Sequence, residues 1–334
     1  MKPILHAWLL AGLLLTPSAH AQLVPGSMEV QWNPGAEDCA AHPQAPLQVH
    51  RYNAQTFILR ENPCSTEEAP FMYLLVGSNK ALLIDTGDIA DPKQMPLAST
   101  VMSLLPGEGA AKLPLVVVHT HGHLDHRSAD PQFQALPHVD VAGTDLAHVQ
   151  QYFGFKDWPN GVAQVDLGDR VVDVLPTPGH YPSHVTYYDR ATGLVFSGDF
   201  FMPGRLIIDD SKADLASAQR IVDFVSTRPV SYVLGGHIEL DANGQNLPMG
   251  GTYHPHEHAL PMTKQDLLGL PATLAHFNGI YSTDGIFVMY NQTRMLWLFG
   301  SAVVVVMVLI GWGLRGLLRR RKNRRLQRAM QTGI

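Results

Sequence analysis

Five histidines and two aspartates stand just after four short apolar runs of the sequence. The runs cover residues 115–118, 171–175, 194–196 and 231–234. The seven residues that follow them are His121, His123, Asp125, His126, His180, Asp199 and His237. Each run is typical of a buried strand, and small residues loosen the backbone between the strand and the polar side chain. Since strand ends at one edge of an α/β fold meet in a cleft, we expect the seven side chains to converge there.

Imidazole and carboxylate groups without thiolates favour zinc, with manganese or iron as alternatives. His121 and His123 are two residues apart, so in an extended segment both rings point to the same side. Asp125 and His126 add a carboxylate and a third imidazole. Three histidines on one ion leave a fourth position for water, which is the arrangement of a catalytic site. One histidine at a strand end is usually a hydrogen-bonded loop residue, whereas this set at matching positions predicts a metal centre.

Strands and helices alternate through the part of the chain that must position these residues. Residues 57–59, 71–76 and 81–84 are predicted strands, with a hairpin turn at 77–79. Helices are expected at residues 96–105, 145–153, 214–226 and 264–277. Residues 241–262 are rich in Gly, Pro and Asn and predict a long loop. The mixture predicts one layered α/β domain over residues 55–290, preceded by a loose lead-in at 22–54.

The metal motifs resemble those of the metallo-β-lactamase superfamily. Residues 121–126 (HGHLDH) look like its first motif, and residues 178–180 (PGH), 197–199 (SGD) and 235–237 (GGH) look like the later ones, in the right order. The resemblance runs from Phe57 to Phe277 and implies a four-layer αββα sandwich with a dinuclear site that holds two zinc ions. It would place His121, His123 and His180 on the first metal, Asp125, His126 and His237 on the second, and Asp199 between them. Asp85, within residues 82–87 (LLIDTG), would support the ligands.

The resemblance also implies a hydrolase in which a hydroxide held by the metals attacks a carbonyl. Asp125 would carry a proton to the leaving group. The β-lactamase branch usually has Cys or Ser where Asp199 stands, so Asp199 favours relatives similar to glyoxalase II and to acyl-homoserine lactonases. We therefore expect the hydrolysis of a small ester, lactone or thioester outside the cytoplasm. The alternatives are a β-lactamase-type amide hydrolase, a persulfide dioxygenase with one iron, and a metal-bound sensor or scaffold without catalysis.

Other polar residues near the motifs have two interpretations. Tyr181 either lines the cleft and donates to a substrate oxygen or packs as a loop aromatic. His184 is expected to support the ligands without binding metal, and His119 to be a strand-end residue. The segment from His254 to His258 (HPHEH) would form either a solvated lid near the cleft or a third metal site. Pro255 disrupts a regular presentation of ligands and favours the lid.

The two ends of the chain predict export and a membrane tether. Residues 1–21 combine Lys2, a short apolar run and a closing Ala-x-Ala, which is typical of a cleaved signal peptide; an uncleaved anchor is the alternative. Residues 295–314 hold no charge and are long enough to span a bilayer. The tail at 315–334 carries eight Lys and Arg, which would hold it in the cytoplasm and the body outside. A buried core helix followed by a nucleic-acid-binding tail is the alternative, but the apolar run has no polar face.

The cysteines and the charge agree with this location, which for a bacterial cell would be the periplasm. Cys39 and Cys64 are the only cysteines, and in an oxidising compartment a bridge between them is favoured over free thiols. Without Lys2 and the tail, the chain has 15 basic and 29 acidic residues, a formal charge of −14. Phosphate binding needs clustered Lys and Arg, so we exclude a nucleic acid as the partner of the body and expect a small-molecule substrate. The sequence does not decide the oligomeric state.

Overall fold

The first of two large sheets has six strands and carries the first metal motif at the end of one of them. In the computed structural model, which describes residues 22–331, the strand order is β1-β2-β3-β4-β5-β6. The strands are β1 (Leu47–Asn53), β2 (Thr56–Glu61), β3 (Phe71–Val76), β4 (Ala81–Ile84), β5 (Leu115–Val118) and β6 (Val139–Val141). The first four pair antiparallel, while β4, β5 and β6 pair parallel. The predicted signal peptide at 1–21 lies outside the described residues.

The second sheet has five strands and carries the other three motifs. Its order is β12-β10-β9-β8-β7, with strands β7 (Ala163–Asp166), β8 (Val171–Pro176), β9 (Val185–Asp189), β10 (Leu194–Gly198) and β12 (Tyr232–Gly235). β10 and β12 pair in parallel, with Gly198 opposite Gly235. Their carboxyl ends therefore lie together, and Asp199 and His237 follow directly.

The two sheets pack face to face around a shared apolar core. Side chains alternate between the faces of a strand, so each strand gives about half of its residues to this layer. Ile58, Tyr73 and Leu82 from the first sheet and Tyr187 and Phe196 from the second are buried in it. The rings of Tyr73 and Phe196 meet across the interface with their centroids 4.6 Å apart. The core thus fixes the sheets relative to one another, and with them the four strand ends.

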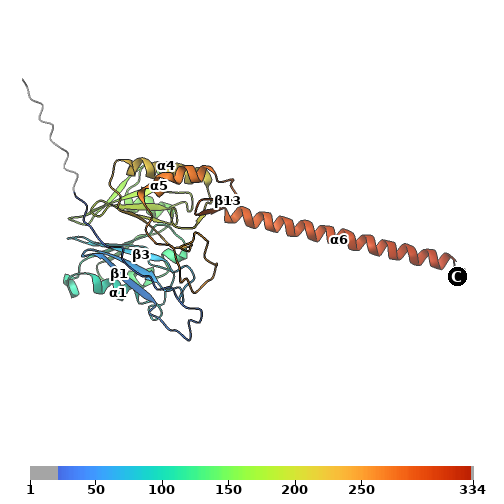
Figure 1. The fold of residues 1–334 in the computed structure, drawn as a ribbon, viewed down its shortest axis with the longest axis horizontal. Coiled ribbons are helices and arrows are strands. Elements are labelled where there is room, and N and C mark those ends of the chain that lie inside the picture. Colours follow the sequence, from blue (N-terminus) through green and yellow to red (C-terminus); the bar gives the residue numbers. More distant parts are fainter. Residues whose placement is uncertain (1–21, 332–334) are drawn as a thin grey trace, which may run out of the picture.

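Helices cover the outer faces of both sheets (Figure 1). α1 (Leu97–Leu104) and α2 (Asp130–Gln134) pack on the first sheet, and α4 (Ser211–Ser226) and α5 (Lys264–Ala275) on the second. α3 (Leu146–Phe153) follows β6, and single 3₁₀ turns occur at Gly109–Ala111 and Leu124–His126. The expected αββα sandwich is confirmed. α4 begins three residues before the predicted start, because Asp210 caps it by accepting hydrogen bonds from the backbone amides of Lys212 and Ala213.

The folded domain begins before its predicted start at residue 55, and it has additional strands near its end. β1 lies in the segment expected to be a loose lead-in, so that expectation is wrong for residues 47–53. It is an edge strand with mostly half-buried side chains, so its sequence carries little apolar signal. Near the end of the predicted domain, no strand was expected in residues 278–290. They contain β13 (Tyr281–Asp284) and β14 (Phe287–Tyr290), which join β11 (Arg205–Ile207) in a small sheet of order β11-β14-β13.

One long helix, α6 (Gln292–Gln331), leaves the domain directly after β14. It contains the apolar residues 295–314 and continues without a break into the basic residues expected to form a separate tail. The helix is long and apolar enough to cross a membrane, and the rest of the protein buries none of its apolar window. Figure 1 shows it projecting away from the sandwich. The alternative of a buried core helix is therefore wrong.

A disulfide joins Cys39 and Cys64, as expected, with 5.6 Å between the Cα atoms. It ties the segment before β1 to the loop after β2 and closes a separation of 25 residues. A bridge of this span contributes about 3–4 kcal/mol by limiting the unfolded chain. The loop after β2 also carries Glu67 and Glu68, which line the cleft described below. The bridge therefore restrains one wall of the cleft.

The buried Glu61, at the end of β2, makes stability depend on pH. Burial raises the pKa of Glu61 to about 8, and repulsion from the Asp88 and Asp125 carboxylates adds to this effect. The hydrogen bonds that Glu61 accepts from the amides of Asp88 and Ile89 act in the opposite direction. The unfolded chain releases this proton near pH 4.5, so unfolding becomes more favourable as pH rises from that value to about 8.

We therefore expect Glu61→Gln to stabilise the protein relative to wild type by about 2–4 kcal/mol more at pH 8 than at pH 5. Urea unfolding at the two pH values measures the difference. Glu29→Gln, at an exposed position, is the control and should show no such change. An equal effect of Glu61→Gln at both pH values would contradict the buried, protonated carboxyl.

Candidate metal centre

Glycines next to the ligands let the strand ends approach one another. Gly198 has a φ of +50°, and a Cβ there would lie 2.6 Å from the side chain of Thr120. A Cβ on Gly236 would lie 2.3 Å from an oxygen of Asp199 and 2.8 Å from the ring of His126. Any larger residue at these positions would push the ligand-bearing segments apart. This explains why the later motifs read Ser-Gly-Asp and Gly-Gly-His.

Three histidines form the first cluster. Nε2 of His121 lies 2.9 Å from Nδ1 of His123 and 3.2 Å from Nε2 of His180. Nδ1 of His123 and Nε2 of His180 are 3.1 Å apart. Ligands arranged tetrahedrally at zinc distances lie about 3.3 Å from one another. The three nitrogens therefore have the spacing of atoms that share one ion.

Asp125, His126 and His237 form the second cluster. Oδ2 of Asp125 lies 2.9 Å from Nε2 of His126 and 3.0 Å from Nε2 of His237. The two imidazole nitrogens are 3.3 Å apart. The 3₁₀ turn Leu124–His126 creates this arrangement, because it turns Asp125 and His126 out of line with His121 and His123. One hexapeptide thus supplies ligands to both clusters.

Asp199 faces both clusters at once. Its Oδ2 lies 3.9 Å from His121 Nε2 and 3.7 Å from His180 Nε2, while its Oδ1 lies 3.3 Å from His126 Nε2 and 3.5 Å from His237 Nε2. Oδ1 is buried and has no hydrogen-bond partner. A buried carboxylate oxygen without a partner is costly, and a cation would satisfy it. The site therefore fits two ions with Asp199 between them.

The outer ring nitrogens of two of these histidines are held by hydrogen-bond acceptors, and that of a third is held by an ion pair without hydrogen-bond geometry. Nδ1 of His126 lies 2.9 Å from Oδ2 of Asp85, and Nδ1 of His180 lies 2.9 Å from the carbonyl of Ile207. Nδ1 of His237 lies 3.2 Å from Oε2 of Glu68. A proton on each Nδ1 leaves the Nε2 lone pair for a metal and fixes the orientation of the ring. Asp85 also accepts hydrogen bonds from the amide and hydroxyl of Thr120, at 2.7 and 2.9 Å.

The charges of the site divide it into a neutral and an ionic half. Burial, together with the neighbouring histidines, lowers the pKa of His121 well below its usual value, so its ring is neutral. Burial also opposes charge on His126, but the carboxylates of Asp125, Asp199 and Asp85 outweigh it and raise its pKa. In the protein without metal, these carboxylates hold protons on the second cluster. Metal ions would replace those protons, because ligands bind in their deprotonated form.

The other polar residues singled out from the sequence lie beside the clusters. The ring of Tyr181 packs against those of His123 and His121, at 4.9 and 5.7 Å between centroids, and is not among the described residues that line the cleft. His184 is fully buried, stacks on His121 at 5.1 Å and hydrogen-bonds Thr177 at 2.9 Å. His119 pairs with Asp130 at 2.8 Å, outside both clusters.

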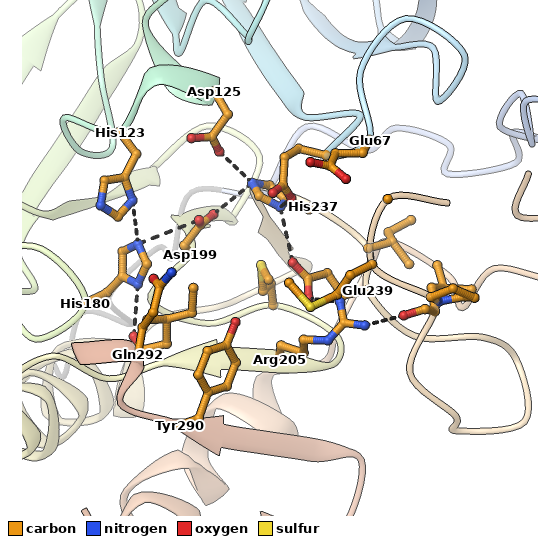
Figure 2. A pocket seen from close by; sticks show the side chains of 18 of the residues that line it. Glu67, His123, Asp125, His180, Asp199, Arg205, His237, Glu239, Tyr290 and Gln292 are labelled. Atoms are coloured by element: carbon orange, nitrogen blue, oxygen red, sulfur yellow. Dashed lines mark hydrogen bonds and ion pairs between the residues drawn. The ribbon is translucent and has the colours of Figure 1, made fainter. Parts of the chain in front are cut away.

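A cavity of about 210 Å³ opens onto the clusters, and Figure 2 shows its labelled side chains. The wall of the cavity that faces away from the clusters was not predicted from the sequence. Most of it comes from segments far apart in the chain: Glu67, Glu68, Met202, Arg205, Glu239, residues 247–250, Tyr290 and Gln292. Glu239, two residues after His237, is the one member whose closeness to a motif could have indicated it. It binds Arg205 at 2.5 Å.

The segment from His254 to His258 borders this cavity. His254 lines it and is 6% exposed, whereas His256 is exposed. Of the groups within the described residues that could hold a metal, none includes a histidine of this segment. The third such group is Glu68, His237 and Glu239, which shares His237 with the second cluster.

A family match and two curated relatives agree with this geometry. The chain is 26% identical over 202 residues to "Acyl-coenzyme A thioesterase MBLAC2" of Gallus gallus, covering 51% of this chain and 72% of that protein. It is 31% identical over 129 residues to a hydroxyacylglutathione hydrolase of Rippkaea orientalis, covering 36% and 46%. A solved metallo-beta-lactamase from Pontibacter korlensis covers 69% of this chain and 100% of that one, with 17% identity and a TM-score of 0.46. Residues 65–237 match the family described as the Metallo-beta-lactamase superfamily, about half of the chain. The protein belongs to the metallo-beta-lactamase superfamily and is a hydrolase of that family.

Proposed function

We propose that the protein is a dinuclear zinc hydrolase that cleaves a small ester, lactone or thioester outside the cytoplasm. One observation carries the proposal: the two oxygens of Asp199 face two separate ligand clusters, and one of them is buried without a partner. Manganese or iron would suit the same nitrogen and oxygen ligands. The similarity to a thioesterase and to a hydroxyacylglutathione hydrolase supports a thioester as the first substrate class to test.

His121, His123 and His180 would hold one ion, Asp125, His126 and His237 the other, and Asp199 both. When bound, the ions would lower the pKa of water toward neutrality and polarise the acyl carbonyl. The protein would exclude bulk water by burying His121, His126 and Asp199, and would fix the ligands through Asp85, Glu68 and the Ile207 carbonyl.

Asp125 is the ligand placed to move a proton. Its side chain is 17% exposed and lines the cavity, whereas the side chains of His121 and His126 are closed off from it. His126 and His237 outweigh the effect of burial and hold the pKa of Asp125 well below its usual range, so its carboxylate is ionised. We propose that Asp125 takes up the proton of the attacking water and passes it to the leaving group.

We also propose that the catalytic domain lies outside the cytoplasm and that α6 tethers it to the membrane. The disulfide supports an oxidising compartment. The basic residues at the C-terminal end of α6 support a cytoplasmic end. Residues 47–290 would form the domain.

A substrate panel tests the proposal on the full chain purified in detergent and loaded with zinc. The panel consists of an S-aryl thioacetate, an aryl acetate, an acyl-homoserine lactone and a chromogenic β-lactam. We expect turnover of one of the first three, at least about tenfold faster than that of the β-lactam. Preferred cleavage of the β-lactam would favour the amide hydrolase. Bound metal without turnover of any substrate on the panel would favour the sensor or scaffold. One iron per chain together with oxygen consumption would favour the persulfide dioxygenase.

A further inference from the structure

His254, in the wall of the cavity, has one ring nitrogen without a hydrogen-bond partner among the described residues. His254 lines the cavity and is 6% exposed. Its Nδ1 lies 3.0 Å from Oε1 of Glu257, and its Nε2 is buried without a hydrogen-bond partner in the described part of the chain. Gly251 lies close to Nε2 of His254, since a Cβ on this glycine would be only 3.1 Å from that nitrogen. Buried polar atoms are nearly always paired, so an unpaired nitrogen in a cavity wall indicates a ligand.

A buried ion pair fixes the proton on the other nitrogen. Arg60 is 1% exposed and donates two hydrogen bonds of 2.6 Å to the carboxylate of Glu257. His254 and Arg60 outweigh the effect of burial and lower the pKa of Glu257, so the carboxylate accepts the Nδ1 proton of His254. The hydrogen bond made by one ring nitrogen determines the role of the other. In the neutral ring with its proton on Nδ1, Nε2 carries the lone pair, so this end of the cavity would accept a hydrogen bond.

Apart from the Arg60–Glu257 pair, the charged group placed near His254 is acidic. Glu67 also lines the cavity. Its carboxylate lies against Gly250, because a Cβ on that glycine would be 3.0 Å from Oε2 of Glu67. Arg205 is the only Lys or Arg among the described residues that line the cavity. Glu239 and the Leu247 carbonyl occupy its guanidinium. A phosphate-bearing leaving group would therefore find carboxylates here and no free cation.

We propose that this end of the cavity, formed by His254 and Glu67 beside Gly250 and Gly251, binds a primary ammonium group of the substrate. The inference rests on the proposed function, since it names the class of ester or thioester that the metal centre cleaves. One N–H of the ammonium donates to Nε2 of His254 and another to the carboxylate of Glu67. Arg60 and Glu257 position His254 and do not touch the substrate.

Three substrates with one reacting group test the proposal on the zinc-loaded full chain. They are S-aryl thioacetates with a para-aminomethyl, para-methyl or para-carboxymethyl group, assayed at pH 7, where the amine is protonated. Hydrogen bonds to charged groups predict a kcat/KM about 10- to 100-fold higher for the ammonium substrate than for the methyl one. The carboxylate substrate should be the slowest. An ammonium-to-methyl ratio near 1 would overturn the proposal.

Variants locate the preference. His254→Ala should lower the ammonium-to-methyl ratio to about 1, and Glu67→Gln, at an exposed position that tolerates the change, should lower it about tenfold. His256→Ala, on the same segment but exposed, is the matched control and should leave the ratio unchanged. A ratio unaffected by both His254→Ala and Glu67→Gln would place the recognition elsewhere and contradict the proposal.

Calorimetric titration with benzylamine separates this inference from the proposed function, because it needs no turnover. We expect benzylammonium to bind the zinc-loaded protein at least about tenfold more tightly than benzyl alcohol, and His254→Ala to abolish the difference. Binding of benzylammonium without hydrolysis of any thioacetate would overturn the thioester as the substrate class and leave the ammonium site standing. Hydrolysis of all three substrates at equal rates, with no benzylammonium binding, would overturn the ammonium site and leave the hydrolase function standing.

Discussion

Asp199→Ala is expected to abolish hydrolysis by weakening both metal sites at once. Asp199 is the residue whose two oxygens face both clusters, so its loss removes one ligand from each ion. The metals supply several kcal/mol of transition-state stabilisation, which corresponds to a loss of activity of about 10³-fold or more. Metal content measured by mass spectrometry should fall together with kcat/KM.

Asp223→Ala is the matched control, because this aspartate lies exposed on α4. It should retain both the metal content and the activity of wild type. If Asp199→Ala instead retained two ions per chain and full activity, the two clusters would not depend on a shared carboxylate. The proposed role of Asp199 between the two ions would then be wrong.

Asp125→Asn is expected to lower the rate according to how much the leaving group needs a proton. The amide keeps the shape of the side chain and an oxygen toward the second cluster but cannot carry the proton. Loss of a general acid costs about 10²–10⁴-fold. We expect this loss for an alkyl thioester or alkyl ester, and a much smaller loss for a nitrothiophenyl ester, whose leaving group departs as an anion.

The comparison of the two leaving groups is the internal control, since both reactions use the same metal centre. Metal content should be measured for the variant at the same time. An equal loss for both substrates, in proportion to lost metal, would show that Asp125 acts only as a ligand.

The sequence was sufficient to predict the layers and the converging residues, because both depend on local patterns. Short apolar runs of three to five residues, each followed within a few positions by polar side chains, predicted β5, β8, β10 and β12 and the residues after them. The spacing within residues 121–126 indicated that several ligands come from one turn. The spacing alone did not divide them between two clusters. The resemblance to the superfamily implied that division, and the 3₁₀ geometry of Leu124–His126 produces it.

The substrate-facing wall could not be predicted, because tertiary packing assembles it from separate loops. Glu67 follows β2, Arg205 begins β11, and Tyr290 ends β14, with no shared spacing that would connect them. The role of His254 depends on Arg60, which is 197 residues away from the Glu257 that it binds. The sequence left Tyr181 two interpretations, substrate contact or a packed loop aromatic, and its ring packs on His121 and His123 as in the second.

The central claim, a hydrolase with two metal ions around Asp199, is tested most directly by the metal content and activity of one sample. The full chain, purified in detergent, is assayed on an S-aryl thioacetate as isolated, after chelation, and after zinc is restored. We predict two ions per chain, loss of turnover when they are removed, and recovery as the second ion returns. Undiminished hydrolysis by the metal-free protein, or two bound ions without turnover of any ester, lactone or thioester, would contradict the account.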